Sequence, residues 1–419
     1  MLLSTMQKLI PSHQGRPSDD PIFALSKEAA ERRARGESVV NATMGALLDD
    51  EGKLAILPTA ARAIREVGEE DWAAYAPISG HPQFLRAVLD DLLGGEPDLR
   101  AAAIAVATPG GTGALRHAIA NHLEPGQALL TTSFYWGPYQ TLADEADRRV
   151  ETFAMFAPQD ASGPGGALAR PGDSTLDLGA LDAALARQVA AQGRVLLFLN
   201  DPCHNPTGYS MQPAEWDGVV ERLLAYAARA PITLLVDTAY FAYNPRDPRA
   251  FLAHLRPLLG KVGLLFAWSA SKTFTHYGLR VGALVACVAD EAERRATEAA
   301  LSYSCRGVWS NCSRGGQVAV TRLLVDDAAR GACDREQRQL TDLLARRVAA
   351  WNELARPRGL SYPRYEGGFF VTVFADDAPA RALRMKERGV FVVPSKNALR
   401  VALCSVAVRD VGRLVGAFG

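Results

Sequence analysis

The sequence predicts an α/β protein with a large lobe, built on a mostly parallel sheet that helices sandwich, and a smaller α+β lobe. Three observations predict this fold. Short apolar runs alternate with longer helical patterns through the middle of the chain. These runs are continuously apolar, which is typical of strands buried on both faces of a parallel sheet. After about residue 330, the pattern changes to a long charged helix followed by short strands.

Seven strands are expected in the sheet of the large lobe. They are predicted at residues 103–108, 127–131, 149–155, 194–200, 232–237, 263–269 and 281–287. Helices are predicted between them at residues 113–122, 138–146, 178–191 and 213–230. Residues 157–175 are rich in glycine and proline and predict a loop.

The tail of the chain is expected to form most of the smaller lobe. A charged helix is predicted at residues 335–354, followed by strands at 367–374, 390–394 and 399–406. We therefore expect an N-terminal arm at residues 1–20, a small α+β domain made of residues 21–55 with 330–419, and a large domain at residues 56–329.

Composition argues against several classes of function. The 419 residues carry a formal net charge of zero, whereas a protein that binds nucleic acid or membrane surfaces is expected to be basic. No apolar run approaches the roughly 20 residues of a membrane helix, and the N-terminus shows no export signal. The six cysteines lack paired zinc spacing and are interpreted as reduced thiols, so we expect a cytoplasmic protein without a metal site.

Lys272 lies in the segment WSASKTFTHYGLRVG, residues 268–282, between two predicted strands. Only seven of the 46 basic residues are lysine, so this chain uses arginine nearly everywhere that a positive charge is sufficient. A desolvated lysine can lose its proton and attack a carbonyl, whereas arginine stays protonated. Lys272 is therefore a candidate nucleophile, and the alternative is a surface lysine at a strand end.

Polar residues follow three other predicted strands, at the edge where open α/β sheets bind ligands. The turn PGGTG, residues 109–113, can hold a phosphate through its backbone, the helix N–H groups and Thr112. The turn DPCHNPTG, residues 201–208, presents the amide of Asn205. Asp237 ends a buried strand, where an acid needs a partner. Each feature alone also fits an ordinary turn or a helix cap.

Together with Ser269, Ser271, Lys272 and Arg280, these loops suit a ligand that has a phosphate, a ring nitrogen and an aldehyde. Pyridoxal 5′-phosphate has these groups, and it binds a lysine as a Schiff base with an acid on its pyridinium nitrogen. We therefore predict pyridoxal 5′-phosphate as the cofactor.

The segments SASKTFTHYGLRVG, CHNPTG and DTAY resemble motifs of fold-type I pyridoxal-phosphate-dependent aminotransferases of class I, particularly the aspartate and aromatic amino acid branch. The resemblance covers nearly the whole chain, from residue 20 to residue 406. It implies the fold of the pyridoxal-phosphate-dependent transferases of fold type I, with the cofactor bound by the large domain.

The resemblance also implies roles for individual residues. Lys272 takes the Schiff-base position, Asp237 contacts the pyridinium nitrogen, and Asn205 and Tyr240 lie near O3′ of the cofactor. The residues that the resemblance places at the phosphate are Gly111, Thr112, Ser269, Ser271 and Arg280. The implied catalytic residues are Lys272, Asp237 and Tyr240.

Further matches concern the substrate and a second subunit. Arg400 takes the position that holds the substrate α-carboxylate, where Gly45 and Asn205 also contact substrate. Arg306 takes the position that binds a distal carboxylate from the neighbouring subunit. Tyr75 takes the position that reaches the neighbour's phosphate, so the resemblance implies a homodimer with shared active sites.

The family stacks an aromatic side chain on the cofactor ring, followed three residues later by a polar or aromatic partner. Trp136 with Tyr139 fits this spacing, and Tyr135 is the alternative to Trp136. Asn200 stands where some aspartate-specific members have histidine, so the hydrogen bonds behind Asp237 are expected to differ.

His204, beside the expected cofactor site, is interpreted either as a packed structural residue or as an indirect support for the cofactor acid.

These observations predict an aminotransferase that acts on an L-amino acid and a 2-oxo acid, such as 2-oxoglutarate, by a ping-pong mechanism. The amino acid is expected to be aromatic or dicarboxylic, such as tyrosine, phenylalanine, aspartate or glutamate. Lys272 is expected to move the proton of the substrate Cα. The alternatives are a pyridoxal-phosphate-dependent C–S/β-lyase or decarboxylase on the same fold, and a non-catalytic regulator that binds the cofactor.

Overall fold

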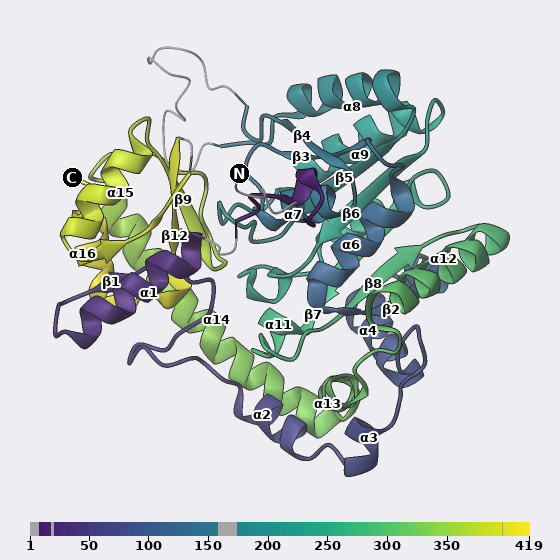
Figure 1. Ribbon diagram of the computed structural model, residues 1–419, viewed down its shortest axis with the longest axis horizontal. Helices are drawn as coiled ribbons and strands as arrows, with labels where there is room; N and C mark the ends of the chain where they lie inside the picture. Colours follow the sequence, from purple (N-terminus) through teal and green to yellow (C-terminus); the bar gives the residue numbers. More distant parts are fainter. Residues whose placement is uncertain (1–7, 18–20, 158–173, 396) are drawn as a thin grey trace, which may run out of the picture.

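The protein is described by a computed structural model that covers residues 8–17, 21–157, 174–395 and 397–419. Its large lobe contains a seven-stranded sheet in the order β2-β8-β7-β6-β5-β3-β4 (Figure 1). Only β8 among these strands runs antiparallel to its neighbours, so the predicted mostly parallel sheet is confirmed. The strands are β2 Ala103–Pro109, β3 Ala128–Thr132, β4 Arg149–Phe153, β5 Val195–Asn200, β6 Ile232–Asp237, β7 Gly263–Ser269 and β8 Val281–Cys287.

Helices cover both faces of this sheet, which explains the continuous apolar runs. Along β5, Leu197 packs in one core cluster, while Leu196 and Phe198 pack in another. Successive side chains of a strand point to opposite faces, so both faces of the strand must be apolar. One face is covered mainly by α4 Pro82–Leu93, α8 Leu178–Gln192, α9 Pro213–Ala227 and α13 Arg314–Val325. The other is covered by α6 Gly110–His122, α7 Pro138–Glu145 and α12 Glu291–Trp309.

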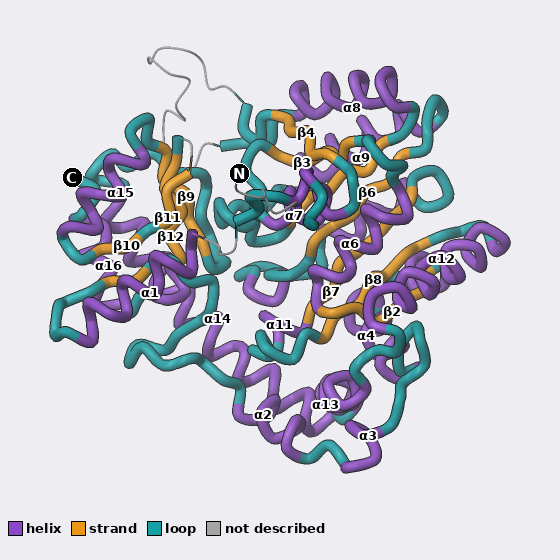
Figure 2. The backbone as a smooth tube through the Cα atoms, viewed as in Figure 1, coloured by secondary structure: helices purple, strands orange, loops and turns teal. Residues whose placement is uncertain are grey.

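The smaller lobe combines residues from both ends of the described chain (Figure 2). Its core cluster joins Val40 and Ala42 to apolar residues between Val348 and Phe418. Helix α14, Asp327–Ala355, runs from the large lobe to the small one (Figure 1). The strands are β1 Val40–Asn41, β9 Phe370–Phe374, β10 Val390–Phe391, β11 Val393–Ser395 and β12 Ala398–Ala402, and the helices are α1 Pro21–Ala34, α15 Ala378–Glu387 and α16 Val411–Gly416.

Several boundaries differ from those predicted. The strand expected at residues 390–394 is two short strands, because β10 pairs with β1 whereas β11 pairs with β12. The helix expected from residue 113 begins at Gly110, because its glycine-rich first turn carries no apolar periodicity. Most of the loop expected at residues 157–175 lies outside the described residues, and the domain limits stay a prediction. The remaining helices are α2 Pro58–Arg65, α3 Glu69–Ala73, α5 Pro97–Ala101, α10 Phe251–Leu255 and α11 Ala270–Thr273, with 3₁₀ turns at Pro11–His13, Phe241–Tyr243, Arg256–Leu258, Leu403–Ser405 and Val408–Asp410.

Candidate active site

A cavity of about 190 Å³ opens at the carboxyl edge of the parallel strands. It brings together every predicted cofactor residue except Tyr75. The lining residues are Gly111, Thr112, Leu115, Trp136, Asn200, Asn205, Asp237, Ala239, Tyr240, Ser269, Ser271, Lys272 and Arg280. A larger cavity, about 360 Å³, lies at the opposite edge around the starts of β5, β6 and β7, and none of the predicted site residues lines it.

Lys272 reaches this cavity from the short helix α11, which directly follows β7. Its Nζ donates a hydrogen bond to the carbonyl oxygen of Gly45 at 3.0 Å and lies 4.5 Å from the ring centre of Tyr277. Burial lowers the pKa of Lys272 to about 8, and the charge of Arg280 acts in the same direction. A substantial fraction of the amine is therefore neutral near pH 8, as a nucleophilic lysine requires.

Asp237 is buried at the end of β6 and accepts two hydrogen bonds on its carboxylate. The donors are the hydroxyl of Tyr139 at 2.7 Å and the backbone N–H of Ala239 at 3.1 Å. Burial raises the pKa of Asp237 to about 6, although both hydrogen bonds lower it. Near neutral pH the carboxylate is thus charged in a dry site, and this favours a cationic ligand group such as a pyridinium N–H.

Sequence reasoning did not identify the contact between Tyr139 and Asp237. Burial and the neighbouring charge of Asp237 raise the pKa of Tyr139, so its phenol stays protonated and donates. The spacing of Tyr139 three residues after Trp136 was the only sequence signal for this residue. Asn200 was expected to change the hydrogen bonds behind Asp237. Its Nδ2 donates to the backbone oxygen of Asp237 at 2.7 Å and not to its carboxylate.

The structure favours the structural interpretation of His204. Its Nδ1 lies 2.8 Å from the hydroxyl of Thr207, within the same turn. Burial lowers the pKa of His204 to about 3, so the imidazole is neutral at physiological pH. Its Nδ1 also accepts from the backbone N–H of Thr207 at 3.4 Å, so these contacts stay within the turn and do not reach Asp237.

Asn205 presents a buried amide to the cavity. Its Nδ2 lies 3.2 Å from the hydroxyl of Tyr240, and its backbone N–H donates to Oδ1 of Asn200 at 2.6 Å. Among the described residues, the side-chain Oδ1 of Asn205 has no hydrogen-bond partner. Buried polar groups are rarely left unpaired, so this amide suits a polar ligand in the cavity.

The start of α6 and the side chain of Arg280 form an anion-binding end of the cavity. Arg280 donates to the hydroxyl of Ser271 at 3.2 Å and to the backbone oxygen of Tyr277 at 2.9 Å. A Cβ on Gly110 would lie 2.5 Å from Nη2 of Arg280, so only glycine lets the guanidinium lie against this turn. Gly111 and Thr112 add helix N–H groups and a hydroxyl, which together fit a phosphate.

The aromatic residues that follow β3 differ in their position relative to the cavity. Trp136 lines the cavity and meets Tyr139 edge to face, with ring centres 5.9 Å apart. Tyr135 instead stacks on Tyr139 and is not among the lining residues. This geometry favours Trp136 over Tyr135 as the residue that stacks on a ring in the cavity.

Two of the predicted substrate residues, Arg400 and Gly45, lie against the ring of Phe370. Arg400 on β12 donates to the backbone oxygen of Thr43 at 2.7 Å, and its guanidinium lies 4.9 Å from the ring centre of Phe370. A Cβ on Gly45 would lie 2.7 Å from Cζ of Phe370, so this ring requires glycine at position 45. Neither Arg400 nor Gly45 lines the cavity, although the carbonyl oxygen of Gly45 accepts from Lys272, which does. Arg306 and Tyr75 are also not among the lining residues of their own chain.

Arg306 and Tyr75 both lie on the surface. Arg306 is in the last turn of α12 and donates to the hydroxyl of Ser310 at 2.8 Å. Tyr75 is 87% exposed.

The described part of the chain comprises residues 8–17, 21–157, 174–395 and 397–419. None of the helices in these ranges combines the length and the apolar character that crossing a membrane requires. Nor do these ranges hold a group of three or more His, Cys, Asp or Glu side chains that could bind a metal ion.

The chain is similar to known proteins over nearly its whole length. Residues 37–418 match the family described as aminotransferase class I and II. The chain is 27% identical to the aromatic-amino-acid aminotransferase of Pseudomonas aeruginosa, over 95% of each chain. It is 27% identical to the aspartate aminotransferase of Escherichia coli, over 90% of this chain and 91% of that one. Its structure resembles that of an aminotransferase from Anaerococcus prevotii, with 29% identity, a TM-score of 0.89 and 98% of each chain covered.

A more distant structural neighbour is the aromatic-amino-acid aminotransferase of Burkholderia pseudomallei, covalently bound to pyridoxal phosphate, at 22% identity and a TM-score of 0.79, with 100% of this chain and 99% of that one covered. At this identity the likeness concerns the fold. The family match, which spans nearly the whole chain, shows that the protein belongs to the aminotransferase class I and II family. It is an aminotransferase, with pyridoxal 5′-phosphate as its cofactor.

Proposed function

We propose that this aminotransferase exchanges an amino group between an aromatic or dicarboxylic L-amino acid and a 2-oxo acid such as 2-oxoglutarate, by a ping-pong mechanism. The observation that carries the proposal is the cavity in which Lys272, Asp237 and Asn205 meet at one sheet edge. The substrate class is supported by relatives named aromatic-amino-acid, aspartate and tyrosine aminotransferases.

The residues of the cavity divide into four groups that would hold the cofactor. Asp237 would bind the ring nitrogen, Asn205 and Tyr240 would bind the O3′ oxygen, and Trp136 would cover the ring. The phosphate would be bound by Gly111, Thr112, Ser269, Ser271 and Arg280. When bound, pyridoxal phosphate supplies an electron sink for the electron pair left on the substrate Cα after deprotonation.

Lys272 would carry out the proton transfer. Its Nζ would accept the proton from the substrate Cα, hold it, and later donate it again within the same site. The lowered pKa of Lys272 supports this role, because the amine must be neutral to accept a proton. Arginine cannot replace it, since a guanidinium stays protonated.

Arg400 would orient the substrate. A guanidinium binds a carboxylate through two parallel N–H donors, and this holds the Cα–H bond in one direction relative to Lys272. The contact of Arg400 with the backbone of Thr43 supports this role, because it restrains the side chain before substrate arrives. Gly45, whose carbonyl oxygen accepts from Lys272, would contact the same end of the substrate.

Two residues would enter the active site from a second subunit. Tyr75 would contact the phosphate of the neighbouring cofactor, and Arg306 would bind the distal carboxylate of a dicarboxylic substrate. The exposure of Tyr75 on its own chain supports this proposal. The enzyme would accordingly be a homodimer in which each active site is completed by its partner.

The six cysteines are free and buried, which supports the reducing environment of the cytoplasm as its compartment.

The decisive test is the visible absorption of the purified enzyme with its cofactor bound. Glutamate, aspartate, tyrosine and phenylalanine are added singly, followed by 2-oxoglutarate. We expect at least one aromatic or dicarboxylic amino acid to convert the absorption band, and the oxo acid to restore it. Release of ammonia and a 2-oxo acid without any second substrate would instead indicate a lyase, and conversion only by other amino acids would refute the proposed substrate class.

A further inference from the structure

Thr372 connects the position of Arg400 to the turn that carries Asn205. Thr372 on β9 lies directly opposite Arg400 on β12 in an antiparallel pair. Opposite residues in such a pair point to the same face, with Cβ atoms about 5 Å apart. Thr372 is 1% exposed, and its hydroxyl donates a hydrogen bond to the backbone oxygen of Pro206 at 2.9 Å. Pro206 immediately follows Asn205.

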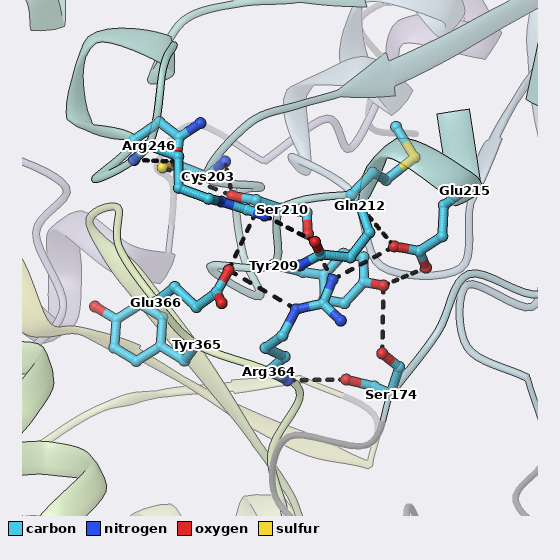
Figure 3. A network of polar contacts seen from close by, with 12 residues as sticks. Ser174, Cys203, Tyr209, Ser210, Gln212, Glu215, Arg246, Arg364, Tyr365 and Glu366 are labelled. Atoms are coloured by element: carbon cyan, nitrogen blue, oxygen red, sulfur yellow. Dashed lines mark hydrogen bonds and ion pairs between the residues drawn. The ribbon is translucent and has the colours of Figure 1, made fainter. Parts of the chain in front are cut away.

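The same stretch of the small lobe contacts the turn at other points. A Cβ on Gly208 would lie 2.1 Å from the backbone oxygen of Phe370 and 2.5 Å from the ring of Tyr365, so the two segments are in close backbone contact. Figure 3 shows the neighbouring polar network, in which Arg364 donates to the backbone oxygen of Ser210 at 2.8 Å. Arg246 and Glu366 form an ion pair at 3.1 Å in this network.

The peptide at Asn205 is thus restrained from two sides. On one side, its N–H donates to Oδ1 of Asn200, which belongs to the large lobe. On the other side, the backbone oxygen of Pro206, the next residue, accepts from Thr372, which belongs to the small lobe. Removal of the hydroxyl of Thr372 would leave the oxygen of Pro206 without this donor and would free one side of the turn.

We propose that Thr372 is a positioning residue, which holds the amide of Asn205 against O3′ of the cofactor and ties that position to the carboxylate site at Arg400. The proposal rests on the roles proposed above for Asn205 and Arg400. The chemical basis for this role is that a hydrogen-bond donor at O3′ stabilises the deprotonated form of the bound cofactor. It therefore lowers the pKa at which the bound cofactor loses its proton. A displaced amide would weaken that donor while the rest of the cavity stays assembled.

The experiment compares Thr372→Val, which keeps the shape but loses the hydroxyl, with Thr372→Ser, which keeps the hydroxyl. Thr321→Val is the matched control, because Thr321 is also buried and donates to a backbone oxygen, that of Gln317 at 2.7 Å, on a helix outside the cavity. Three quantities are measured: the pH at which the absorption band of the bound cofactor changes, the affinity of the cofactor-free enzyme for pyridoxal phosphate, and kcat/KM.

For Thr372→Val we expect the absorption transition to move to higher pH, the affinity for pyridoxal phosphate to fall severalfold, and kcat/KM to fall about tenfold, the size of one hydrogen bond. For Thr372→Ser, the affinity for pyridoxal phosphate and kcat/KM should lie within about twofold of the values of the unchanged enzyme. Thr321→Val should lower the melting temperature without moving the absorption transition.

A double-mutant cycle with Asn205→Ala separates positioning from general stability. If Thr372 acts through Asn205, Thr372→Val should change kcat/KM less than about twofold in the Asn205→Ala background. It should also leave the pH of the absorption transition nearly unchanged in that background. Additive effects in the two backgrounds would overturn the proposal, as would an unmoved absorption transition in Thr372→Val. The absorption and affinity measurements need no amino acid, so they judge Thr372 even if the proposed substrates fail.

Discussion

The hydroxyl of Tyr139 donates a hydrogen bond of 2.7 Å to Oδ2 of Asp237, across 98 residues of sequence. This contact anchors the only carboxylate among the residues that line the cavity. The phenol stays protonated because burial and the charge of Asp237 raise the pKa of Tyr139. Tyr139 therefore acts as a permanent donor that keeps Asp237 charged and oriented.

Substitution of Tyr139 by phenylalanine is expected to weaken cofactor binding. A hydrogen bond to a charged group contributes about 1.5–3 kcal/mol, so the affinity of the cofactor-free enzyme for pyridoxal phosphate should fall about 10- to 100-fold. Titration of the absorption or fluorescence measures this affinity. Tyr135→Phe is the matched control, because Tyr135 stacks on Tyr139, whereas the phenol that donates to Asp237 is that of Tyr139. Equal losses in the two variants would contradict the expectation.

The buried carboxylate of Asp237 should lower the stability of the cofactor-free enzyme as pH rises. Its pKa is about 6 in the folded protein, above the ordinary value of 3.8, so the folded state binds its proton more tightly than the unfolded state. The stability contributed by this group is present below about pH 4 and is lost by about pH 6, a change of ~3 kcal/mol. The unfolding free energy of the wild type minus that of Asp237→Asn should therefore fall between these pH values and stay level above them. A difference that rises with pH would show that the carboxylate is stabilised when charged.

The rate of cofactor capture should report the pKa of Lys272. The neutral amine attacks the aldehyde of pyridoxal phosphate, and the pKa of Lys272 is lowered to about 8. The rate constant for covalent binding by the cofactor-free enzyme should thus rise with pH and level off above about pH 8. Pyridoxamine phosphate, which has no aldehyde, is the control and should lack this profile.

Lys272→Arg should abolish turnover while retaining some affinity for the cofactor phosphate, and normal turnover in that variant would disprove the assigned role.

The close approach of the two lobes at Gly208 predicts a large stability loss for Gly208→Ala. Gly208 has φ of +71°, and its Cβ would lie 2.1 Å from the backbone oxygen of Phe370. Gly359 has a similar φ of +66° but no atom within 4 Å of its Cβ position, so Gly359→Ala isolates the backbone cost, about 1–2 kcal/mol. Chemical denaturation should show Gly208→Ala to be clearly the less stable variant. Equal stabilities would mean that the contact between Gly208 and Phe370 can relax without a measurable cost.

Complementation between subunits tests the shared active site. Lys272→Ala homodimers should be inactive, and Arg306→Ala homodimers should act poorly on dicarboxylic substrates. In a mixed dimer, one active site would combine Lys272 of the Arg306→Ala subunit with Arg306 of the Lys272→Ala subunit. Activity toward aspartate or glutamate should therefore appear when the two variants are refolded together or coexpressed. If the mixture is no more active than the sum of its parts, Arg306 does not act across a dimer.

Local sequence patterns were enough to predict which polar residues follow the strand ends, and in which order. Continuous apolar runs placed the strands to within a few residues, as for β6 at Ile232–Asp237, because periodicity and burial are local properties of the chain. Since carboxyl ends of parallel strands share one sheet edge, Asp237 and Lys272 could be expected in one site before any contact was known. Short turns such as CHNPTG likewise carry their chemistry within a few residues.

Contacts between residues far apart in the sequence depend instead on tertiary packing. Lys272 bonds to Gly45 across 227 residues, Thr372 to Pro206 across 166, and Tyr139 to Asp237 across 98. Local patterns carry no record of such pairs, because strand order and the packing of the lobes set which segments become neighbours. The same reason separates Tyr75 and Arg306 from the cavity: their motifs place them in the chain, but folding leaves both on its surface.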